Sequence, residues 1–561
     1  MSRMTPDEKR VVFASSLGTM FEWYDFFMYG ALAANIAKSF FGQLPAAQGF
    51  LFSLLAFAAG FIVRPFGALF FGRLGDLVGR KYSFLLTIGI MGVSTFFVGL
   101  LPGYQTIGIA APIVLIVLRM LQGLAIGGEY GAAATYVAEY APAAQRGRWT
   151  AWIQTTSTAG LLLSLVVILI VRALTGDSFD EWGWRVPFLL SFVLFIISLY
   201  VRYSMSESPA FLRVKQTGTL SRAPLREAFL KPENAKKVFF ALFGLLLGQG
   251  VVWFTGLFYT MFFLGQTLKI DPSTTNMLTA VGLAISAPFY ILFGMLSDRI
   301  GRKAVILGGC VIAAVTIFPV FKALTHFGNP ALEAALATSP VVLRADPADC
   351  AFQFNPTGTA AFANSCDIAK QALSAASANY SQEDLPGGSP AKVSIRGREV
   401  DSVVSQGLAP AELKTRVASF RKSLSDALSD AGYPRKAAPD EINKTVVTAL
   451  LAFIMIVSAM TLAPMAAVLV ELFPTQIRYS AISLPYHIGN GWFGGLLPSI
   501  CFALVAWKGD IYFGLWYPVG GAIVCAVIGM LFVRESTGCD LQTVHRSDDE
   551  GPIGRLAPST R

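Results

Sequence analysis

Runs of about twenty apolar residues recur along almost the whole chain, and few charged residues interrupt them. A helix needs roughly 20 such residues to cross a bilayer, where only helices and closed barrels satisfy their own backbone polar groups. Hydrophobic residues make up 54% of the chain and charged residues 14%, whereas soluble domains are about a quarter charged. The sequence therefore predicts an all-α integral membrane protein.

The apolar runs predict twelve membrane-spanning helices, which places both termini on one side of the membrane. The predicted spans are 11–37, 49–71, 82–101, 109–138, 149–173, 186–204, 237–265, 275–296, 304–324, 445–470, 480–506 and 513–534. Lys and Arg concentrate in one set of loops, which predicts that these loops and both termini lie in the cytoplasm. The net charge of +9 then reflects topology and anionic lipid headgroups, and no nucleic acid is needed to explain it.

Two internal repeats divide the chain into two six-helix halves. Residues 72–81 (GRLGDLVGRK) return as 294–303 (GMLSDRIGRK) at an offset of 222, and 139–146 (EYAPAAQR) return as 471–478 (ELFPTQIR) at an offset of 332. The second half must therefore hold about 110 extra residues between these landmarks. The predicted organisation is an N-terminal half at 1–204, a cytoplasmic linker at 205–236, a C-terminal half at 237–324 and 445–534, an extracytoplasmic insert at 325–444 and a cytoplasmic tail at 535–561.

The insert is rich in Ala, Ser, Pro and charge, and it lacks long apolar runs. Apolar residues at helical spacing predict one amphipathic helix between Pro410 and Gly432, formed by Leu413, Val417, Phe420, Leu424 and Leu428. An oxidising exterior would allow Cys350 and Cys366 to form a disulfide, but sequence spacing does not supply the required geometry. We leave that bond open.

The repeated G-x-L-x-D-x-x-G-R-K loop resembles the cytoplasmic loop motif of the major facilitator superfamily. The resemblance implies twelve helices in two halves around a central cavity, and a cytoplasmic gate formed by Asp76, Arg80, Asp298 and Arg302. Each carboxylate can bind a helix N-terminus of the other half, while each arginine bonds helix-end carbonyls. A purely topogenic role would explain Arg and Lys, but not the matched Asp and Gly.

Three further segments, 22–30, 64–67 and 119–129, resemble the metabolite:proton symporters, which carry α-ketoglutarate, citrate, shikimate, proline or betaine. The large insert departs from the pattern of that branch. In related carriers an acid on the first helix pairs with an arginine on the fourth, which maps here to Asp25 and Arg119. Protonation of Asp25 would then release Arg119 for a substrate carboxylate, with Glu22 as the rival acid. The alternative is a permanent structural ion pair.

Polar residues inside the predicted spans are candidates for substrate or proton binding, because isolated charges in lipid are costly. We consider Glu129 either a proton site or a carboxyl locked by helix packing, and Arg64 either a substrate ligand or part of the inner gate. The remaining substrate candidates share polar helix faces with these residues: Tyr29, Gln122, Gln249, Trp253 and Asn490. Trp253 could cage a cationic headgroup or simply pack.

These features favour proton-coupled uptake of a small organic acid by alternating access. A zwitterionic osmolyte such as proline or betaine, a passive uniporter, and a non-transporting receptor that acts through the insert remain as alternatives. No Walker loop, clustered catalytic set or metal site is evident, so we expect no enzyme activity and no cofactor beyond the proton gradient. The expected partners of a monomer are the solute, protons, membrane lipid and an unknown exterior protein that binds the insert.

Overall fold

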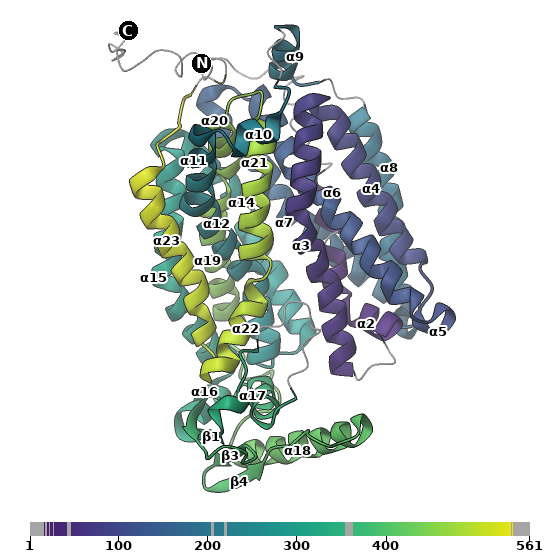
Figure 1. Ribbon diagram of the computed structural model, residues 1–561, viewed down its shortest axis with the longest axis vertical. Helices are drawn as coiled ribbons and strands as arrows, with labels where there is room; N and C mark the ends of the chain where they lie inside the picture. Colours follow the sequence, from purple (N-terminus) through teal and green to yellow (C-terminus); the bar gives the residue numbers. More distant parts are fainter. Residues whose placement is uncertain are drawn as a thin grey trace.

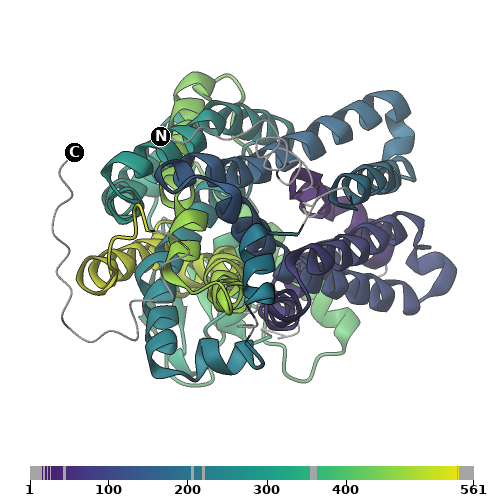
Figure 2. The same cartoon turned by 90° about the horizontal axis from the view of Figure 1, so that it is seen from above.

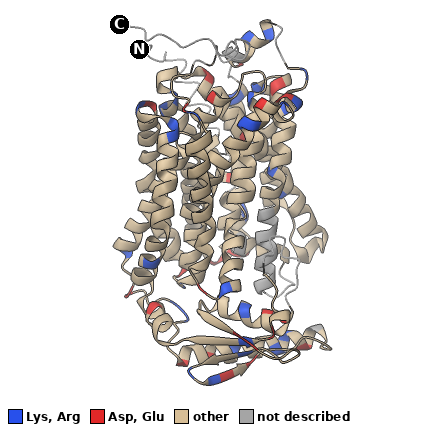
Figure 3. Ribbon diagram, turned by 60° about the vertical axis from the view of Figure 1, so that its left-hand side comes forward, with Lys and Arg blue, Asp and Glu red and all other residues tan. Residues whose placement is uncertain are grey.

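The computed structural model describes residues 16, 19–21, 23–25, 27–41, 46–203, 207–217, 221–353, 363–539 and 541. Two helical bundles pack side by side, the N-terminal half in purple and blue and the C-terminal half in teal to yellow (Figures 1 and 2). Charged residues gather at the two ends of the bundle and on the domain below it, and they are sparse in the middle (Figure 3). This is the distribution expected for a chain that crosses a membrane.

The N-terminal half starts with helical residues that lead into α2 (Ala33–Phe41). Its long helices are α3 (Ala46–Leu77), α4 (Arg80–Leu100), α6 (Ala110–Tyr140), α7 (Arg146–Thr175) and α8 (Val186–Tyr203), with short helices α5 (Tyr104–Ile107), η1 (Ala143–Gln145), η2 (Gly176–Phe179) and η3 (Gly183–Arg185). The linker contains α9 (Pro209–Gln216) and α10 (Pro224–Phe229).

The seventh span of the C-terminal half alternates α- and π-helical turns: α11 (Pro232–Ala241), η4 (Leu242–Leu246), α12 (Leu247–Phe254), η5 (Thr255–Tyr259), α13 (Thr260–Phe262) and η6 (Phe263–Thr267). Such π turns are rare and often mark functional sites. The remaining helices are α14 (Pro272–Ile300), α15 (Arg302–Gly328), α19 (Lys444–Leu462), α20 (Met465–Leu472), α21 (Arg478–His487), the π segment η8 (Ile488–Gly494), α22 (Leu497–Lys508), η9 (Phe513–Leu515) and α23 (Trp516–Phe532).

Ten helices among the described residues are long and apolar enough to cross a membrane. The predicted total of twelve counts two more, the first span and α3. Most helices extend past the predicted edges; α3, for example, continues to Leu77 where the prediction ends at 71. As a result, Asp76, Arg80, Asp298 and Arg302 of the loop repeats lie on helical turns and not in loops. Hydrogen-bonding partners, many of them in the other half, compensate these charges. The predicted insert is also slightly too long, since α15 ends at Gly328 and α19 begins at Lys444.

Glycines bring α3 and α6 into close contact. A Cβ atom on Gly67 would lie 2.0 Å from the carbonyl oxygen of Leu124, and one on Gly127 would lie 2.2 Å from that of Arg64. Only glycine permits this approach, and small residues serve the same purpose at many membrane helix interfaces. The contact places Arg64 on α3 close to Glu129 on α6.

The residues between α15 and α19 form a separate α/β unit at the end of the bundle opposite α9 and α10 (Figure 1). It contains α16 (Pro330–Thr338), β1 (Val341–Ala345), η7 (Pro347–Asp349), α17 (Ser365–Ala375), β2 (Tyr380–Asp384), β3 (Lys392–Ile395), β4 (Arg398–Asp401) and α18 (Pro410–Asp430). The strands form one sheet in the order β2-β1-β3-β4; β1 pairs in parallel with β2 (Val341 opposite Tyr380) and antiparallel with β3 (Val341 opposite Ile395). We call this unit the insert domain.

The predicted amphipathic helix of the insert domain is α18, and Phe420, Leu424 and Leu428 on it are buried. Cys350 and Cys366 are joined in a disulfide with their Cα atoms 5.2 Å apart. The domain is bonded to the C-terminal half: Tyr380 N–H donates to the carbonyl of Gly509 at 2.7 Å, and Lys269 Nζ donates to that of Ala375 at 2.6 Å. The insert domain is therefore attached to the ends of the seventh and eleventh spans.

Candidate functional site

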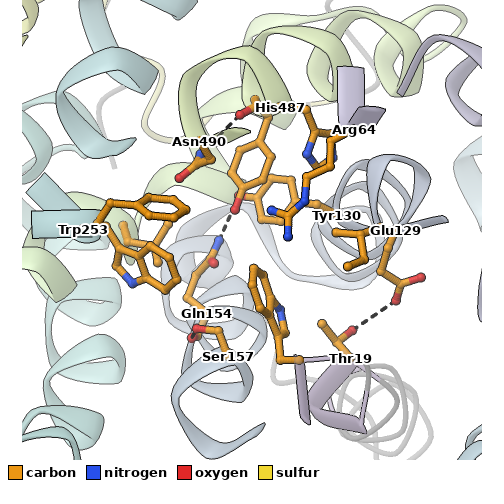
Figure 4. Close-up of a pocket in the computed structure, with 14 residues that line it drawn as sticks. Thr19, Arg64, Glu129, Tyr130, Gln154, Ser157, Trp253, His487 and Asn490 are labelled. Atoms are coloured by element: carbon orange, nitrogen blue, oxygen red, sulfur yellow. Dashed lines mark hydrogen bonds between the residues drawn. The ribbon is translucent and has the colours of Figure 1, made fainter. Parts of the chain in front are cut away.

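A small cavity lies between the two halves and is lined by residues of both (Figure 4). Its walls come from the first span, α3, α6, α7, α12, α19, α21 and η8. The lining residues include Trp23, Arg64, Glu129, Tyr130, Gln154, Trp253, Tyr486, His487 and Asn490. Its free space is about 30 Å³, enough for about two water molecules. A metabolite would need the halves to move apart before it could enter.

One wall of the cavity carries a buried cation beside two tyrosines. The Arg64 side chain is 2% exposed and its guanidinium lies 4.2 Å above the Phe61 ring. The Tyr130 and Tyr486 rings stack with their centroids 3.4 Å apart, and Gln154 donates to the Tyr130 hydroxyl at 2.8 Å. This wall can present one guanidinium and phenol groups to an anionic ligand.

The opposite wall is aromatic. The Trp253 ring lies 6.1 Å from that of Trp23, and its indole N–H donates to the Tyr290 hydroxyl at 3.2 Å. Gln249 and Asn490 exchange two amide hydrogen bonds of 3.0 and 2.9 Å. Of the three substrate candidates predicted in the second half, Trp253 and Asn490 line the cavity, and Gln249 holds Asn490 in place.

Glu129 lines the cavity next to Arg64 and forms a buried ion pair that sequence reasoning missed. Its two carboxylate oxygens accept hydrogen bonds from Arg202 in the last turn of α8, one of them at 3.0 Å. Thr87 on α4 donates to Glu129 at 3.2 Å and Thr19 on the first span at 3.5 Å. The available signal was an arginine within the last turn of an apolar span, where an unpaired charge would be costly.

The predicted residues of the first and fourth spans form a second cluster, outside the cavity lining. Arg119 donates to Gln122 and lies 4.1 Å above the Tyr29 ring, while Gln122 donates to Thr95 at 2.9 Å. Asp25 is buried nearby and interacts electrostatically with Arg119. Glu22 lies outside the described residues.

The two loop repeats each bind the opposite half. Asp76, at the end of α3, accepts backbone hydrogen bonds from Tyr479 and Ser480 in the first turn of α21, at 3.3 and 2.9 Å. Asp298, at the end of α14, accepts bonds of 2.8 Å from the first turn of α7, donated by Gly147 and Arg148. Backbone N–H groups there lack intrahelical partners, and the helix dipole favours a carboxylate. These are the contacts expected for the two aspartates.

The two arginines of the loop repeats differ. Arg80 donates to the carbonyl of Thr475 at 2.9 Å, as expected. Arg302 instead donates to the carboxylates of Asp298 at 2.5 Å and Glu471 at 3.3 Å. The predicted carbonyl partner is wrong for Arg302, because two carboxylates lie within reach and charge-assisted bonds are stronger.

The second repeat, which the sequence analysis left without a role, supplies ion pairs between the halves. Arg478 binds Glu139, and Arg146 binds Glu471, each at 2.7 Å. We call the charged residues of both repeats the latch: Asp76, Arg80, Glu139, Arg146, Asp298, Arg302, Glu471 and Arg478. In this conformation the latch ties the two halves together at the end that carries α9 and α10.

Comparison with known proteins identifies the family. The family described as sugar (and other) transporter matches residues 11–337 and 431–547. The chain belongs to this family. Its relatives and its fold are those of major facilitator transporters and not those of enzymes. Residues 338–430, which form most of the insert domain, lie outside the family match.

Three relatives from Escherichia coli strain K12 show the range of named solutes. The proline/betaine transporter is 37% identical over 322 residues, which cover 56% of this chain and 64% of that protein. The shikimate transporter is 35% identical over 323 residues (56% and 72%), and the alpha-ketoglutarate permease 31% over 334 residues (59% and 76%). The transporter thus spans less than two thirds of the length of the proline/betaine transporter.

Among solved structures, the proton:xylose symporter XylE bound to 6-bromo-6-deoxy-D-glucose matches with a TM-score of 0.60 at 16% identity, over 96% of this chain and 98% of that one. At this identity the match shows the fold alone.

Proposed function

We propose that this transporter carries a small carboxylate-bearing metabolite into the cell together with protons, by alternating access across a bacterial cytoplasmic membrane. The observation that carries the proposal is Arg64, a buried guanidinium that faces the cavity between the halves beside Tyr130 and Tyr486. A guanidinium in a site screened from water binds a carboxylate strongly and with defined geometry.

Two buried carboxyls support the proton-coupled part of the proposal. Asp25 lies close to Arg119 on the neighbouring α6, and Glu129 lines the cavity itself. A carboxyl that gains a proton during transport loses its negative charge and therefore its attraction for a nearby arginine. The arginine can then attract an anionic solute. We assign proton binding to Asp25 and Glu129, with Arg119, Tyr29 and Gln122 around Asp25. Solute binding is assigned to Arg64, Trp253 and Asn490.

The latch supports alternating access. It closes the end of the bundle that we assign to the cytoplasm, and the small cavity corresponds to an occluded conformation between outward- and inward-open forms. No bound cofactor enters this cycle, because the proton gradient supplies the energy.

A second candidate solute is a zwitterionic osmolyte such as proline or glycine betaine. Trp23 and Trp253 form an aromatic wall opposite Arg64, and such a wall attracts a quaternary ammonium group. The same cavity could then bind the carboxylate of a zwitterion at Arg64 and its cationic end at the tryptophans.

The deciding experiment is uptake of labelled α-ketoglutarate, citrate, shikimate, proline and glycine betaine into energised vesicles, with and without a protonophore. We expect one class of solute to accumulate, and accumulation to be lost with the protonophore and with Asp25→Asn. Accumulation of a solute that is unaffected by the protonophore would contradict proton coupling and make the protein a uniporter. Failure of every carboxylate-bearing solute would contradict the assignment of Arg64.

A further inference from the structure

The ion pair between Glu129 and Arg202 lies directly beside the latch. Gly128, the residue before Glu129, accepts a hydrogen bond through its carbonyl from the hydroxyl of Tyr479 on α21. Tyr479 belongs to the opposite half, and its backbone N–H is one of the two donors to Asp76. One residue of the C-terminal half therefore contacts both the latch and the backbone of the cavity carboxylate.

The first two turns of α4 make the same connection from the N-terminal half. Arg80 of the latch donates to the carbonyl of Thr475, and the Ser83 hydroxyl lies 2.9 Å from that of Tyr479. One turn further, the guanidinium of Arg202 lies 4.4 Å above the Phe84 ring, and Thr87 donates to Glu129. These residues follow one another at helical spacing, so one face of α4 runs from the latch to the ion pair.

We propose that Arg202 and Tyr479 are positioning residues that couple the charge of Glu129 to the closure of the latch. While Glu129 is ionised, Arg202 is held between Glu129 and Phe84, and α4 and α6 stay in the register that lets Ser83 and Gly128 contact the Tyr479 hydroxyl. When Glu129 takes up a proton, Arg202 loses its counter-ion and shifts. The contacts to Tyr479 then weaken, and the latch opens.

This inference rests on the proposed function, in which protons enter from outside the cell and the latch closes the cytoplasmic side. A proton that reaches the cavity from outside would neutralise Glu129 and release the cytoplasmic side, which is the order that uptake requires. The charged or titratable groups around Glu129 are Arg202 on α8, Tyr479 and His487 on α21, Arg64 on α3 and Tyr130 on α6. Arg202 alone among them forms an ion pair with Glu129 in the described part of the chain.

The test measures opening of the latch directly, without a transported solute. Spin labels are placed at Val78 and Ile300, exposed positions at the ends of α3 and α14, in a Cys539→Ser background, and the distance between them is measured in detergent or nanodiscs. We expect Glu129→Gln to raise the ratio of open to closed forms by about threefold or more, since coupling of this kind is typically worth several-fold in an equilibrium. In a Tyr479→Phe background the same substitution should leave the ratio unchanged.

Matched variants keep the test decisive. Tyr140→Phe removes a hydroxyl from the same end of α6, where it contacts the carbonyl of Glu207, and should leave the effect of Glu129→Gln intact. If Glu129→Gln fails to fold because Arg202 then lacks the Glu129 carboxylate, Glu129→Gln with Arg202→Gln removes both charges and should open the latch in the same way.

An equal effect of Glu129→Gln in both backgrounds would overturn the role of Tyr479, and a closed latch in both Glu129 variants would overturn the coupling itself. Protonophore-sensitive uptake by the native chain, measured separately, reports on the proposed function whatever the distances show.

Discussion

The carboxylate of Glu139 and the guanidinium of Arg478 form an ion pair of 2.7 Å across the boundary between the two halves, and both side chains are fully buried. The mirror-related pair, Arg146 and Glu471, has the same length. Each glutamate also faces an arginine of its own half, Arg80 at 3.8 Å from Glu139 and Arg302 at 3.3 Å from Glu471. The latch is therefore a symmetric network of buried charges in which each glutamate faces two arginines, so removal of a glutamate takes a counter-charge from both.

We expect Glu139→Gln to open the latch and to lower stability. Removal of one partner from a buried ion pair typically costs about 3–5 kcal/mol. The measurements are thermal unfolding in detergent and the distance between spin labels at Val78 and Ile300. Asp180→Asn is the control, because the Arg172–Asp180 pair is more than half exposed and such pairs contribute about 0–1 kcal/mol. Equal unfolding temperatures for Glu139→Gln and the native chain would contradict the role assigned to this pair.

The two walls of the cavity should act on different parts of a solute. We expect Arg64→Gln to raise KM for every carboxylate-bearing solute. Trp253→Leu should raise KM for glycine betaine by about tenfold, because a desolvated cation–π contact is worth roughly 1–2 kcal/mol, and should change that for α-ketoglutarate little. Uptake kinetics with both solutes check this, and Trp182→Leu, at an exposed tryptophan, is the control. An equal rise for both solutes would show that Trp253 only packs.

Much of this fold could be predicted from the sequence. Apolar runs and the positions of Lys and Arg follow from the cost of placing polar groups in lipid, so they locate most spans within a few residues. The contacts of Asp76 and Asp298 could also be predicted, because each requires only one aspartate and the N-terminus of one helix in the other half. The strands of the insert domain could not be predicted in this way, because they contain four or five residues each and their pairing joins segments far apart in the chain.

The candidate site was harder to predict, because it depends on how helices rotate against one another. Arg119 and Gln122 were predicted on a polar face of the fourth span and Tyr29 on one of the first span, but none of the three lines the cavity: Gln122 bonds Thr95, and Arg119 lies over the Tyr29 ring. Glu129 was predicted, whereas its partner Arg202 lies 73 residues further along the chain, and no local spacing connects them. Ion pairs between distant helices require knowledge of the packing.

Glu535, just after α23, should stabilise the start of α15 in a pH-dependent way. Burial acts to raise the pKa of its carboxyl, but the bonds from the Thr537 side chain and from the N–H groups of Arg302 and Lys303 outweigh burial, and the pKa lies below its ordinary value. The stabilisation is therefore complete above the ordinary range near pH 4 and is lost as the pH falls through the lowered pKa.

We expect Glu535→Gln to cost about 1 kcal/mol at neutral pH, a value typical of a lost helix cap. The difference from the native chain, measured as thermal unfolding between pH 7 and pH 3, should shrink at the acid end. Glu441→Gln, at an exposed glutamate in the insert domain, should show no such trend. A difference that grows on acidification would show that the ionised carboxyl is not the stabilising form.

The disulfide between Cys350 and Cys366 allows the orientation of the insert domain to be measured. We predict that this domain lies outside the cytoplasm and that Cys539, whose carbonyl accepts a bond from Arg146 of the latch, lies inside. In intact spheroplasts, a membrane-impermeant maleimide should label nothing on the native chain until an impermeant reductant is added, and should then label the partly exposed Cys350 of the insert domain. Cys350→Ser with Cys366→Ser removes that signal, and Cys539→Ser removes the label that appears only after permeabilisation. The three remaining cysteines are buried, so we expect no labelling of them. Labelling of Cys539 from outside would reverse the proposed topology and, with it, the assignment of the latch to the cytoplasmic side.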